Sequence, residues 1–338
     1  MRYYTALFQS VAELPSDVPR LAALKQKMSI GDVQFESALA SLQRIVQFAY
    51  GRKSALMCIP WIAAQLLWFW DFHVLERLEK WQVQFGPHLN EWFTAVGELE
   101  ALSSLAALKH DHPDWQFADV QDGHAQIVGE QMGHPLLKEC VRNSASIGPD
   151  GSFLLVTGSN MSGKSTLLRS FGVNTVLALA GGPVCADSFQ LPPVEIATSM
   201  RITDSLDSGV SFFMAELKRI KSIVDRARVL DDEGGVRLFY LLDEILQGTN
   251  SAERHVAVTR IISHLLQTRA LGAVSTHDLE LADSAELAEK SQLVHLRETI
   301  EDVDGVEQMR FDYVVREGVT PTTNALKLLE LVGLGESR

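Results

Sequence analysis

The sequence predicts an α/β fold with a mainly parallel central sheet, preceded by an all-helical region. Short apolar runs with the length and composition of buried strands fall at residues 153–156, 236–242 and 271–274. Helical segments are expected between and after them, around 212–229, 252–268 and 278–289. Strands that alternate with helices indicate parallel pairing, because a helix must carry the chain back before the next parallel strand begins.

Weaker strand candidates complete the second half of the chain, at residues 194–197, 292–296 and 309–315. The last two could pair antiparallel. With the change from helical patterning to alternating strands and helices, we expect one domain at 1–120 and a second at 121–338. A length of 338 residues also fits about two domains.

The first 120 residues show helical periodicity. One set of apolar residues recurs at helical spacing, namely Phe35, Ala38, Leu39, Leu42, Ile45, Val46 and Ala49. A second run begins near Pro87. It is expected to place one apolar face toward the core, formed by Trp92, Phe93, Val96, Leu99, Leu102 and Leu105.

The most apolar stretch, residues 54–70, carries no charged side chain. It contains Pro60 and Gln65, and it is shorter than the about 20 apolar residues that a membrane span needs. We therefore expect a buried core helix that continues into the charged residues 76–80. Contact with a membrane is the alternative, because the stretch contains tryptophans, which are favoured at membrane interfaces.

Composition excludes several classes of protein. The chain is 46% hydrophobic and 22% charged, which is ordinary for a globular protein and excludes a disordered or fibrous one. Its net charge of -13 makes it a poor general binder of polyanions, so contact with nucleic acid would need a local patch or a partner. Cys58, Cys140 and Cys185 are far apart in sequence and predict neither a disulfide framework nor a zinc site. A reducing, cytoplasmic location fits them, and no signal peptide is visible.

A phosphate-binding (Walker A) pattern, G-x-x-x-x-G-K-[ST], begins at Gly158. Its glycines allow backbone N–H groups to approach a phosphate closely, and the helix that follows directs its positive end at the anion. We expect Lys164 to contact the β- and γ-phosphates of ATP and the Ser165 hydroxyl to ligate Mg²⁺. The predicted nucleotide-binding segment comprises Gly158, Ser159, Asn160, Met161, Ser162, Gly163, Lys164, Ser165 and Thr166.

Two acidic residues follow the apolar run at 236–242. Buried parallel strands end at the sheet edge where α/β proteins bind their ligands. We expect Asp243 to hold Mg²⁺, through water, and Glu244 to activate the attacking water. The other interpretation is a strand that simply ends in a solvated acidic turn.

A histidine follows the apolar run at 271–274. His277 would reach the same sheet edge, where an imidazole can hydrogen-bond the γ-phosphate or the attacking water. A structural histidine is the alternative at this position.

Together these motifs resemble the ATPase domain of the MutS family of DNA mismatch-repair proteins. Residues 157–166 are similar to the family's TGPNMGGKST and differ from it at Ser159 and Ser162. The order and spacing of the motifs agree over about residues 130–335. The other similar segments are GHPLL at 133–137, the signature loop S-x-F-M-x-E within 207–216, DE-x-x-x-GT at 243–249 and [AS]TH at 275–277.

The resemblance implies a P-loop NTPase of the ABC/MutS type that binds ATP and Mg²⁺. In that family two ATPase domains dimerise on ATP, and each site is completed by the partner's signature loop. A homodimer with composite sites would bring Ser211 to the γ-phosphate in trans and place Asn250 and Ser251 at the subunit boundary. Tyr313 would lie near the adenine. Hydrolysis would be coupled to a DNA transaction such as mismatch repair, with residues 1–120 resembling the family's core and lever region.

The chain also departs from the family. None of its 15 phenylalanines is followed by Glu two positions later, although the family's mismatch-reading domain uses Phe-x-Glu. We therefore expect a divergent branch of the family, or a fragment of a longer protein. A nucleotide-gated interaction or membrane-associated scaffold, with slow or no turnover and without DNA, is the alternative function. A different P-loop enzyme, such as a small-molecule kinase or a transporter ATPase, is the third hypothesis.

Overall fold

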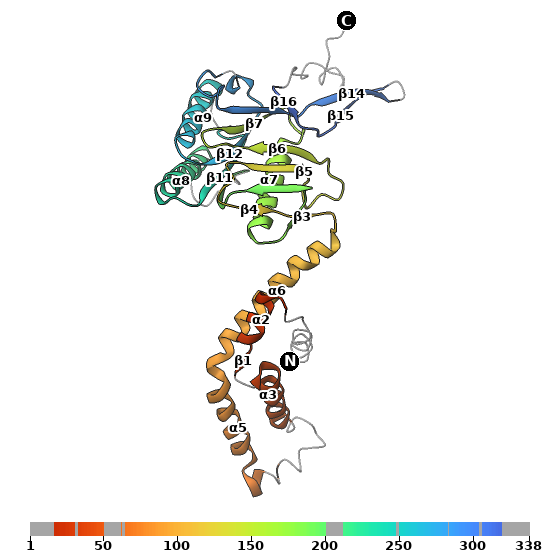
Figure 1. Ribbon diagram of the computed structural model, residues 1–338, viewed down its shortest axis with the longest axis vertical. Helices are drawn as coiled ribbons and strands as arrows, with labels where there is room; N and C mark the ends of the chain where they lie inside the picture. Colours follow the sequence, from red (N-terminus) through yellow and green to blue (C-terminus); the bar gives the residue numbers. More distant parts are fainter. Residues whose placement is uncertain are drawn as a thin grey trace. The chain divides into compact units, whose positions relative to one another are not determined.

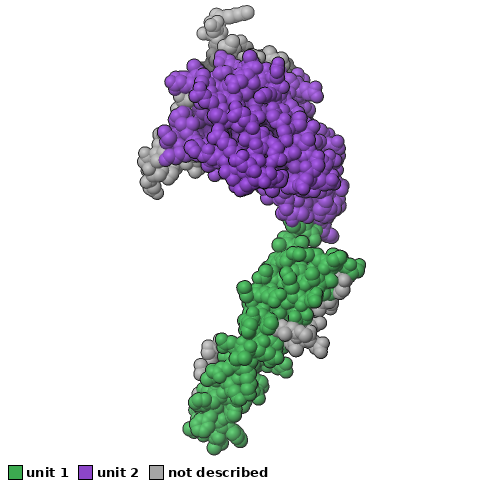
Figure 2. All heavy atoms as spheres, turned by 60° about the vertical axis from the view of Figure 1, so that its left-hand side comes forward, with its two compact units in different colours: residues 1–106 green, residues 107–338 purple. Residues whose placement is uncertain are grey.

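The computed structural model of the chain describes residues 17–30, 33–50, 62, 65–200, 212–247, 250–282, 284–303 and 306–319. It divides into two compact units, residues 1–106 and residues 107–338, which Figure 2 shows in different colours. The division falls inside helix α6 (Leu89–Asp111), before residue 120 at which the sequence patterning changes.

The first unit is mainly helical but not all-helical, which corrects the prediction. Its helices are α2 (Pro19–Lys27), α3 (Phe35–Tyr50), α5 (Trp70–Phe85), the short η3 (Gly86–His88) and the first part of α6. Strands β1 (Ser29–Ile30) and β2 (Val33–Gln34) form a short antiparallel pair. The β-branched Ile30 and Val33 flank a Gly-Asp dipeptide, which is a hairpin signal. The pair also returns the chain so that the Phe35 N–H donates to the Met28 carbonyl, at 3.1 Å.

Aromatic side chains form the core of the first unit. Phe35, Trp81, Phe85 and Trp92 are all buried, and the Trp81 indole N–H donates to the Ala38 carbonyl at 2.8 Å. The predicted helices at 35–49 and from Pro87 onward are confirmed, but the second apolar face is narrower than expected. Trp92, Val96 and Leu99 are buried, whereas Phe93 and Leu102 are exposed. Phe93 is about 100° round the helix from Trp92, so it cannot share that face.

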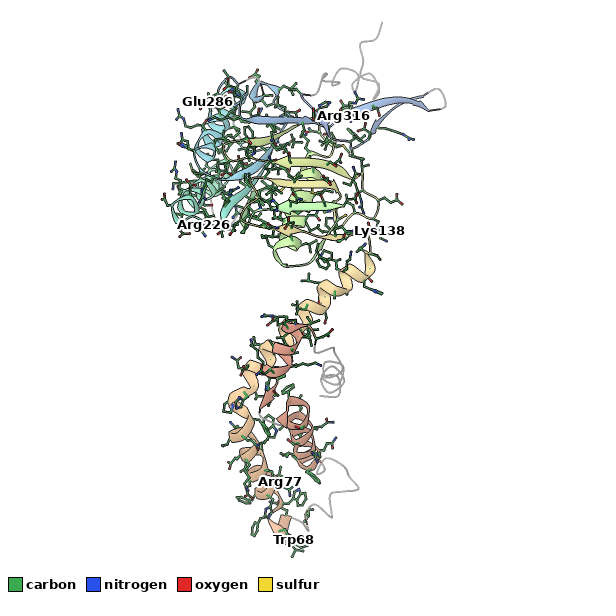
Figure 3. All side chains as sticks on the ribbon, viewed as in Figure 1. Trp68, Arg77, Lys138, Arg226, Glu286 and Arg316 are labelled. Atoms are coloured by element: carbon green, nitrogen blue, oxygen red, sulfur yellow. The ribbon has the colours of Figure 1, made fainter. Side chains whose placement is uncertain are left out.

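The segment before α5 does not continue that helix. Residues 65–68 are helical, but Phe69 has a left-handed backbone, with φ of 47°, which an α-helix cannot propagate. Leu66, Leu67, Trp68 and Phe69 are between 63% and 75% exposed, so the expected buried core helix is wrong for these residues. Figure 3 labels Trp68 on this segment. The rest of the run at 54–64, apart from residue 62, lies outside the described residues.

Within the described part of the chain, no helix is long and apolar enough to cross a membrane.

The second unit is built on a six-stranded sheet of the order β10-β11-β12-β7-β13-β16. The first five strands in this order run parallel, and β16 pairs antiparallel with β13. The α/β class predicted from the sequence is confirmed. The strands are β7 (Phe153–Thr157), β10 (Val194–Ser199), β11 (Arg237–Asp243), β12 (Leu271–Thr276), β13 (Ser291–His295) and β16 (Arg316–Glu317).

Helices cover both faces of this sheet (Figure 1). Helices α8 (Phe212–Glu233) and α9 (Ser251–Leu266) pack against one face, where Ile223 and Ile262 meet Tyr240 and Leu242. Helix α7 (Lys164–Leu179) packs against the other, where Phe171 meets Phe239 and Leu241. Because side chains alternate between the two faces of a strand, the continuous apolar run of β11 is buried on both sides.

Short strands complete the second unit. A four-stranded sheet of the order β4-β9-β5-β6 packs on the α7 side through Ile127, Ile147 and Phe189. The predicted strand at 309–315 is partly wrong: β15 ends at Phe311 and pairs antiparallel with β14, and β16 takes the place beside β13. The strands outside the large sheet are β3 (Gln116–Phe117), β4 (Asp119–Val120), β5 (Ile127–Met132), β6 (Asn143–Ile147), β8 (Pro183–Val184), β9 (Ser188–Leu191), β14 (Glu298–Val303) and β15 (Val306–Phe311). A short helix, η5 (Leu279–Leu281), follows β12.

Candidate functional site

The carboxyl ends of β7, β11 and β12 meet at one edge of the large sheet. Thr157 is in register with Thr276, and Ser275 with Asp243. The phosphate-binding loop, the Asp243-Glu244 pair and His277 follow residues 157, 242 and 276. These three predicted parts of the site therefore begin side by side. This is the edge at which open α/β sheets bind their ligands.

The loop after β7 has the backbone of an anion cradle. Gly158, Met161 and Gly163 have φ values of 145°, 68° and 105°, in the left-handed region. A β-carbon on Gly158 would lie 2.4 Å from the Leu296 carbonyl oxygen, so only glycine fits there. Helix α7 begins directly afterwards, at Lys164, with the positive end of its dipole toward the loop.

Lys164 is held at the centre of the site. Its side chain is only 4% exposed. The ammonium group donates to the carbonyl oxygens of Gly158 and Ser159, both at 2.9 Å, and lies 3.2 Å from Glu244 Oε1. A buried ammonium ion needs such partners to offset the loss of hydration. A phosphate in the loop could replace these partners.

Asp243 accepts two hydroxyl hydrogen bonds. Ser165 Oγ donates to Asp243 Oδ1 at 2.9 Å, and Ser275 Oγ donates to the same oxygen. Carboxylate and hydroxyl oxygens are the ligands that Mg²⁺ prefers. Among the described residues, no group of three or more His, Cys, Asp or Glu side chains could hold a metal ion. A cation between Ser165 and Asp243 would thus take its other ligands from water or phosphate.

Glu244 lies beside Lys164 in a strained turn, with φ of 49°. Its carboxylate accepts from Gln247 Nε2 at 2.6 Å and lies 3.6 Å from His277 Nδ1. Burial raises the pKa of Glu244, but the Lys164 charge, the hydrogen bonds and His277 outweigh burial and lower the pKa overall. Glu244 is therefore ionised at neutral pH, as a general base must be.

Glu216 supports the turn that carries Glu244, and sequence reasoning did not assign it a role. Its side chain is buried at 5% exposure, and Oε1 accepts from the Leu246 N–H at 2.9 Å. Leu246 itself has a φ of 61°, so this hydrogen bond stabilises a strained backbone. Burial raises the pKa of the Glu216 carboxyl, and the Leu246 hydrogen bond opposes that rise.

The raised pKa predicts how stability depends on pH. Ionising a buried carboxyl costs stability once the pH exceeds the unfolded pKa of about 4.3. The free energy of unfolding should therefore fall as the pH rises from there through the folded pKa. Glu216→Gln keeps the acceptor for Leu246 and should flatten this fall, whereas Glu216→Ala leaves a buried N–H unpaired and should cost about 1–3 kcal/mol. Urea unfolding at several pH values measures the free energy of unfolding of both variants. If that free energy fell with pH in Glu216→Gln as steeply as in the parent, Glu216 would not be the group responsible.

A cavity of about 600 Å³ opens beside the loop. The phosphate-loop residues Asn160 to Thr166, apart from Ser162, line one side, with Met161 81% exposed. Tyr313 lines it too and packs over Gly163, where a β-carbon would lie 3.1 Å from the ring. Asn143, which sequence reasoning missed, donates to the Tyr313 carbonyl at 2.9 Å and fixes this wall. The cavity is large enough for a nucleotide.

The structure brings together most of the predicted site residues. Ser162 is buried, and its hydroxyl has no hydrogen-bond partner among the described residues. Asn250 caps α9, accepting from the Glu253 N–H at 2.9 Å, and Ser251 is the first residue of that helix. Ser211, for which a role in trans is expected, lies outside the described residues, as do Gly248 and Thr249 of the segment at 243–249.

Comparison with known proteins identifies relatives of this chain. The family model for MutS domain V matches residues 154–337. The DNA mismatch repair protein MSH6 of Arabidopsis thaliana is 29% identical over 271 residues, which cover 74% of this chain and 20% of the relative. The DNA mismatch repair protein MutS of Aquifex pyrophilus is 29% identical over 251 residues, 72% of this chain and 28% of the relative. The DNA mismatch repair protein MutS of Persephonella marina is 26% identical over 274 residues, which cover 79% of this chain and 30% of the relative. The chain spans less than a third of the length of these relatives.

Proposed function

The chain belongs to the MutS family, and on that premise we propose that its second unit is a P-loop ATPase of the ABC/MutS type. It binds ATP with Mg²⁺, dimerises on ATP and couples hydrolysis to a DNA transaction such as mismatch repair. The observation that carries the proposal is the meeting of Lys164, Asp243, Glu244 and His277 at one sheet edge, next to a cavity of about 600 Å³.

Nucleotide binding uses the loop at 158–166. The triphosphate lies along the loop's backbone N–H groups, and Lys164 exchanges its carbonyl partners for the β- and γ-phosphates. Tyr313 stacks near the base on the cavity wall. Ser165 and Asp243, whose side chains are hydrogen-bonded at 2.9 Å, would hold Mg²⁺ when it is bound. The ion would supply positive charge that offsets the negative charge of the phosphates.

Hydrolysis uses Glu244 as the general base. Once Lys164 turns to the phosphates, Glu244 loses its closest cation and faces their negative charge, so its pKa rises and it accepts a proton more readily. His277, 3.6 Å from Glu244 in the nucleotide-free site, orients the attacking water or contacts the γ-phosphate. Both groups project from the same sheet edge as the phosphate loop.

Glu298 tunes the loop electrostatically. This residue is 8% exposed, and its Oε2 accepts from Ser159 Oγ at 2.6 Å. A buried carboxylate beside the loop repels bound phosphates. Glu298→Gln keeps the acceptor and removes the charge, so we expect several-fold tighter nucleotide binding, with a larger gain for ATP than for ADP. Equilibrium titration with both nucleotides tests this, with the exposed Glu289→Gln as the matched control. Equal or weaker binding would contradict it.

Dimerisation completes each site with the partner's Ser211. Ser211→Ala should lower turnover without loss of nucleotide binding by the monomer. Mixing the Ser211→Ala protein with the Lys164→Ala protein tests directly whether the two subunits share each site. In a mixed dimer one composite site combines an intact Lys164 with an intact Ser211, so activity should recover on mixing. No recovery would count against sites shared in trans.

ATP turnover with and without DNA tests the function as a whole. The rate is measured alone and with homoduplex, mismatched and branched DNA, at one fixed salt concentration because non-specific DNA binding depends steeply on salt. Stimulation by one DNA form would support the proposal and name the substrate class. Turnover that no DNA changes would favour the second candidate.

That second candidate is a nucleotide-gated interaction scaffold. It is supported by the exposed apolar side chains of the first unit, Leu66, Leu67, Trp68, Phe69 and Phe72. An exposed apolar patch of this kind often marks a surface that binds a protein or a membrane. If turnover ignores DNA, binding of the ATP-loaded protein to lipid vesicles is the next measurement.

A further inference from the structure

Cys140 and Cys185 lie side by side, and the proposed reaction uses neither. A β-carbon built on Gly133 would lie 2.6 Å from Cys140 Sγ and 2.9 Å from Cys185 Sγ. The two sulfurs are therefore no farther apart than the sum of these distances. Because residue 133 is glycine, no β-carbon occupies the position that both sulfurs adjoin. Both cysteines are free thiols.

The two thiols differ in their surroundings. Cys140 is partly exposed and lines the nucleotide cavity. Cys185 is buried at 4% exposure and is held rigidly. Its N–H donates to Asn174 Oδ1 at 2.7 Å, and its carbonyl accepts from the Gly133 N–H at 2.8 Å. Asn174 is a fully buried residue of α7, so Cys185 is tied to the helix that begins at the phosphate loop.

The loop that carries Cys140 is packed more loosely. It connects β5 to β6 without regular structure, and Leu136, Leu137 and Val141 on it are exposed. A loop of this kind can shift by the short distance that an S–S bond of about 2 Å requires. Cys140 would move toward Cys185, because the latter is fixed.

We propose that Cys140 and Cys185 are a modification site, a thiol pair that forms a reversible disulfide and so reshapes the wall of the nucleotide cavity. With hydrogen peroxide as the oxidant, the Cys140 thiol loses its proton and the thiolate attacks one peroxide oxygen. The O–O bond breaks, Cys140 becomes a sulfenic acid, and the hydroxide released takes up the lost proton to give water. The Cys185 thiol then attacks the sulfenic sulfur, forms the S–S bond and releases a second water. Two thiols and one peroxide thus give one disulfide and two waters.

The order of these steps follows from the surroundings. Cys140 is the thiol that the peroxide can reach. Burial and the neighbouring Cys140 raise the pKa of the Cys185 thiol, and the guanidinium of Arg142 opposes that rise. Asp114, which pairs with Arg142, raises it further. Cys185 therefore serves as the second, slower thiol.

The effect on binding rests on the proposed function. Cys140, Val141 and Asn143 all line the cavity, and Asn143 also holds the backbone of Tyr313. A disulfide would draw the Cys140 side chain away from the cavity. It would also prevent the loop between β5 and β6 from adjusting to a nucleotide. We expect nucleotide binding to weaken several-fold on oxidation and to recover on reduction.

The test uses the full chain carrying Cys58→Ser, so that no third thiol competes. The reduced protein is treated with hydrogen peroxide, its free thiols are blocked with N-ethylmaleimide, and its peptides are mapped by mass spectrometry without reduction. The expected product joins the peptides of Cys140 and Cys185. Cys140→Ser should not form it, and Gly133→Ala, which keeps both thiols but fills the space between them, should suppress it. Peroxide treatment that leaves both thiols unpaired, or overoxidises Cys140 alone, would overturn the proposal.

A fluorescent ADP analogue then measures affinity before oxidation, after it and after reduction. We expect the Cys58→Ser protein to lose affinity several-fold on oxidation and to regain it on reduction. The Cys140→Ser variant should show no such loss. A disulfide that leaves affinity unchanged would overturn the effect on the cavity. Failure of the reduced protein to bind nucleotide would instead refute the proposed function, while the peptide map still decides whether the thiols pair.

Discussion

Replacing Lys164 with alanine is expected to abolish nucleotide binding. The ammonium group is nearly buried and lies at the start of α7, where a bound phosphate would replace its contacts with Gly158 and Ser159. Loss of two charge-assisted hydrogen bonds to phosphate corresponds to about 3 kcal/mol or more, which is roughly a hundredfold in affinity. Titration of the variant with ATP and ADP measures the loss.

The matched control for this change is Lys290→Ala, which removes an exposed lysine far from the loop in sequence. It should bind nucleotide like the parent. Thermal unfolding of Lys164→Ala must also be recorded, because the two carbonyl oxygens lose their donor. Binding within a few-fold of the parent by a folded Lys164→Ala protein would refute the phosphate role of this lysine.

Glu244→Gln is expected to slow hydrolysis by roughly 10²–10⁴-fold, the usual contribution of a general base. The same change should tighten ATP binding, because it removes the carboxylate that holds Lys164 at 3.2 Å in the nucleotide-free site. Slow turnover with tight binding would trap the ATP-bound dimer. Single-turnover hydrolysis and size-exclusion chromatography with ATP measure the two effects.

Glu289→Gln is the control here too, since that side chain is exposed. It should leave both rate and affinity unchanged. Hydrolysis by Glu244→Gln at the parent rate would show that another group activates the water. Weaker binding of ATP by Glu244→Gln would contradict the competition between Glu244 and the phosphates for Lys164.

Local patterns were enough to predict the five parallel strands of the large sheet, but not the antiparallel β16. The residues at 153–156, 238–242 and 271–274 are buried on both faces, so their apolar character is continuous and easily recognised. Errors occurred where pairing decides the structure. Strands β1 and β2 have only two residues each, and the six-residue strands β14 and β15 pair with each other rather than with the large sheet. The hydrophobicity of a strand does not by itself specify its pairing partner.

Residues that act through a neighbour could not be predicted. Lys164 and Glu244 stand in motifs whose spacing carries the chemistry. Glu298 stands in no motif, and Glu216 is the last residue of the signature pattern, which gives it no role of its own. Only folding places Glu216 against Leu246 and Glu298 against Ser159. Burial of a carboxylate is a property of the surrounding packing, which no short pattern encodes.

The sequence by itself determined the α/β class, the membership in the MutS family that its motifs suggested and the three strand ends that carry the site, because each depends on residues close together in the chain. The tertiary structure alone decided how those strand ends share one edge, which glutamates support them and that Cys140 adjoins Cys185. Contacts between residues far apart in sequence depend on how helices and sheets pack, and packing is settled by the whole core rather than by any one segment.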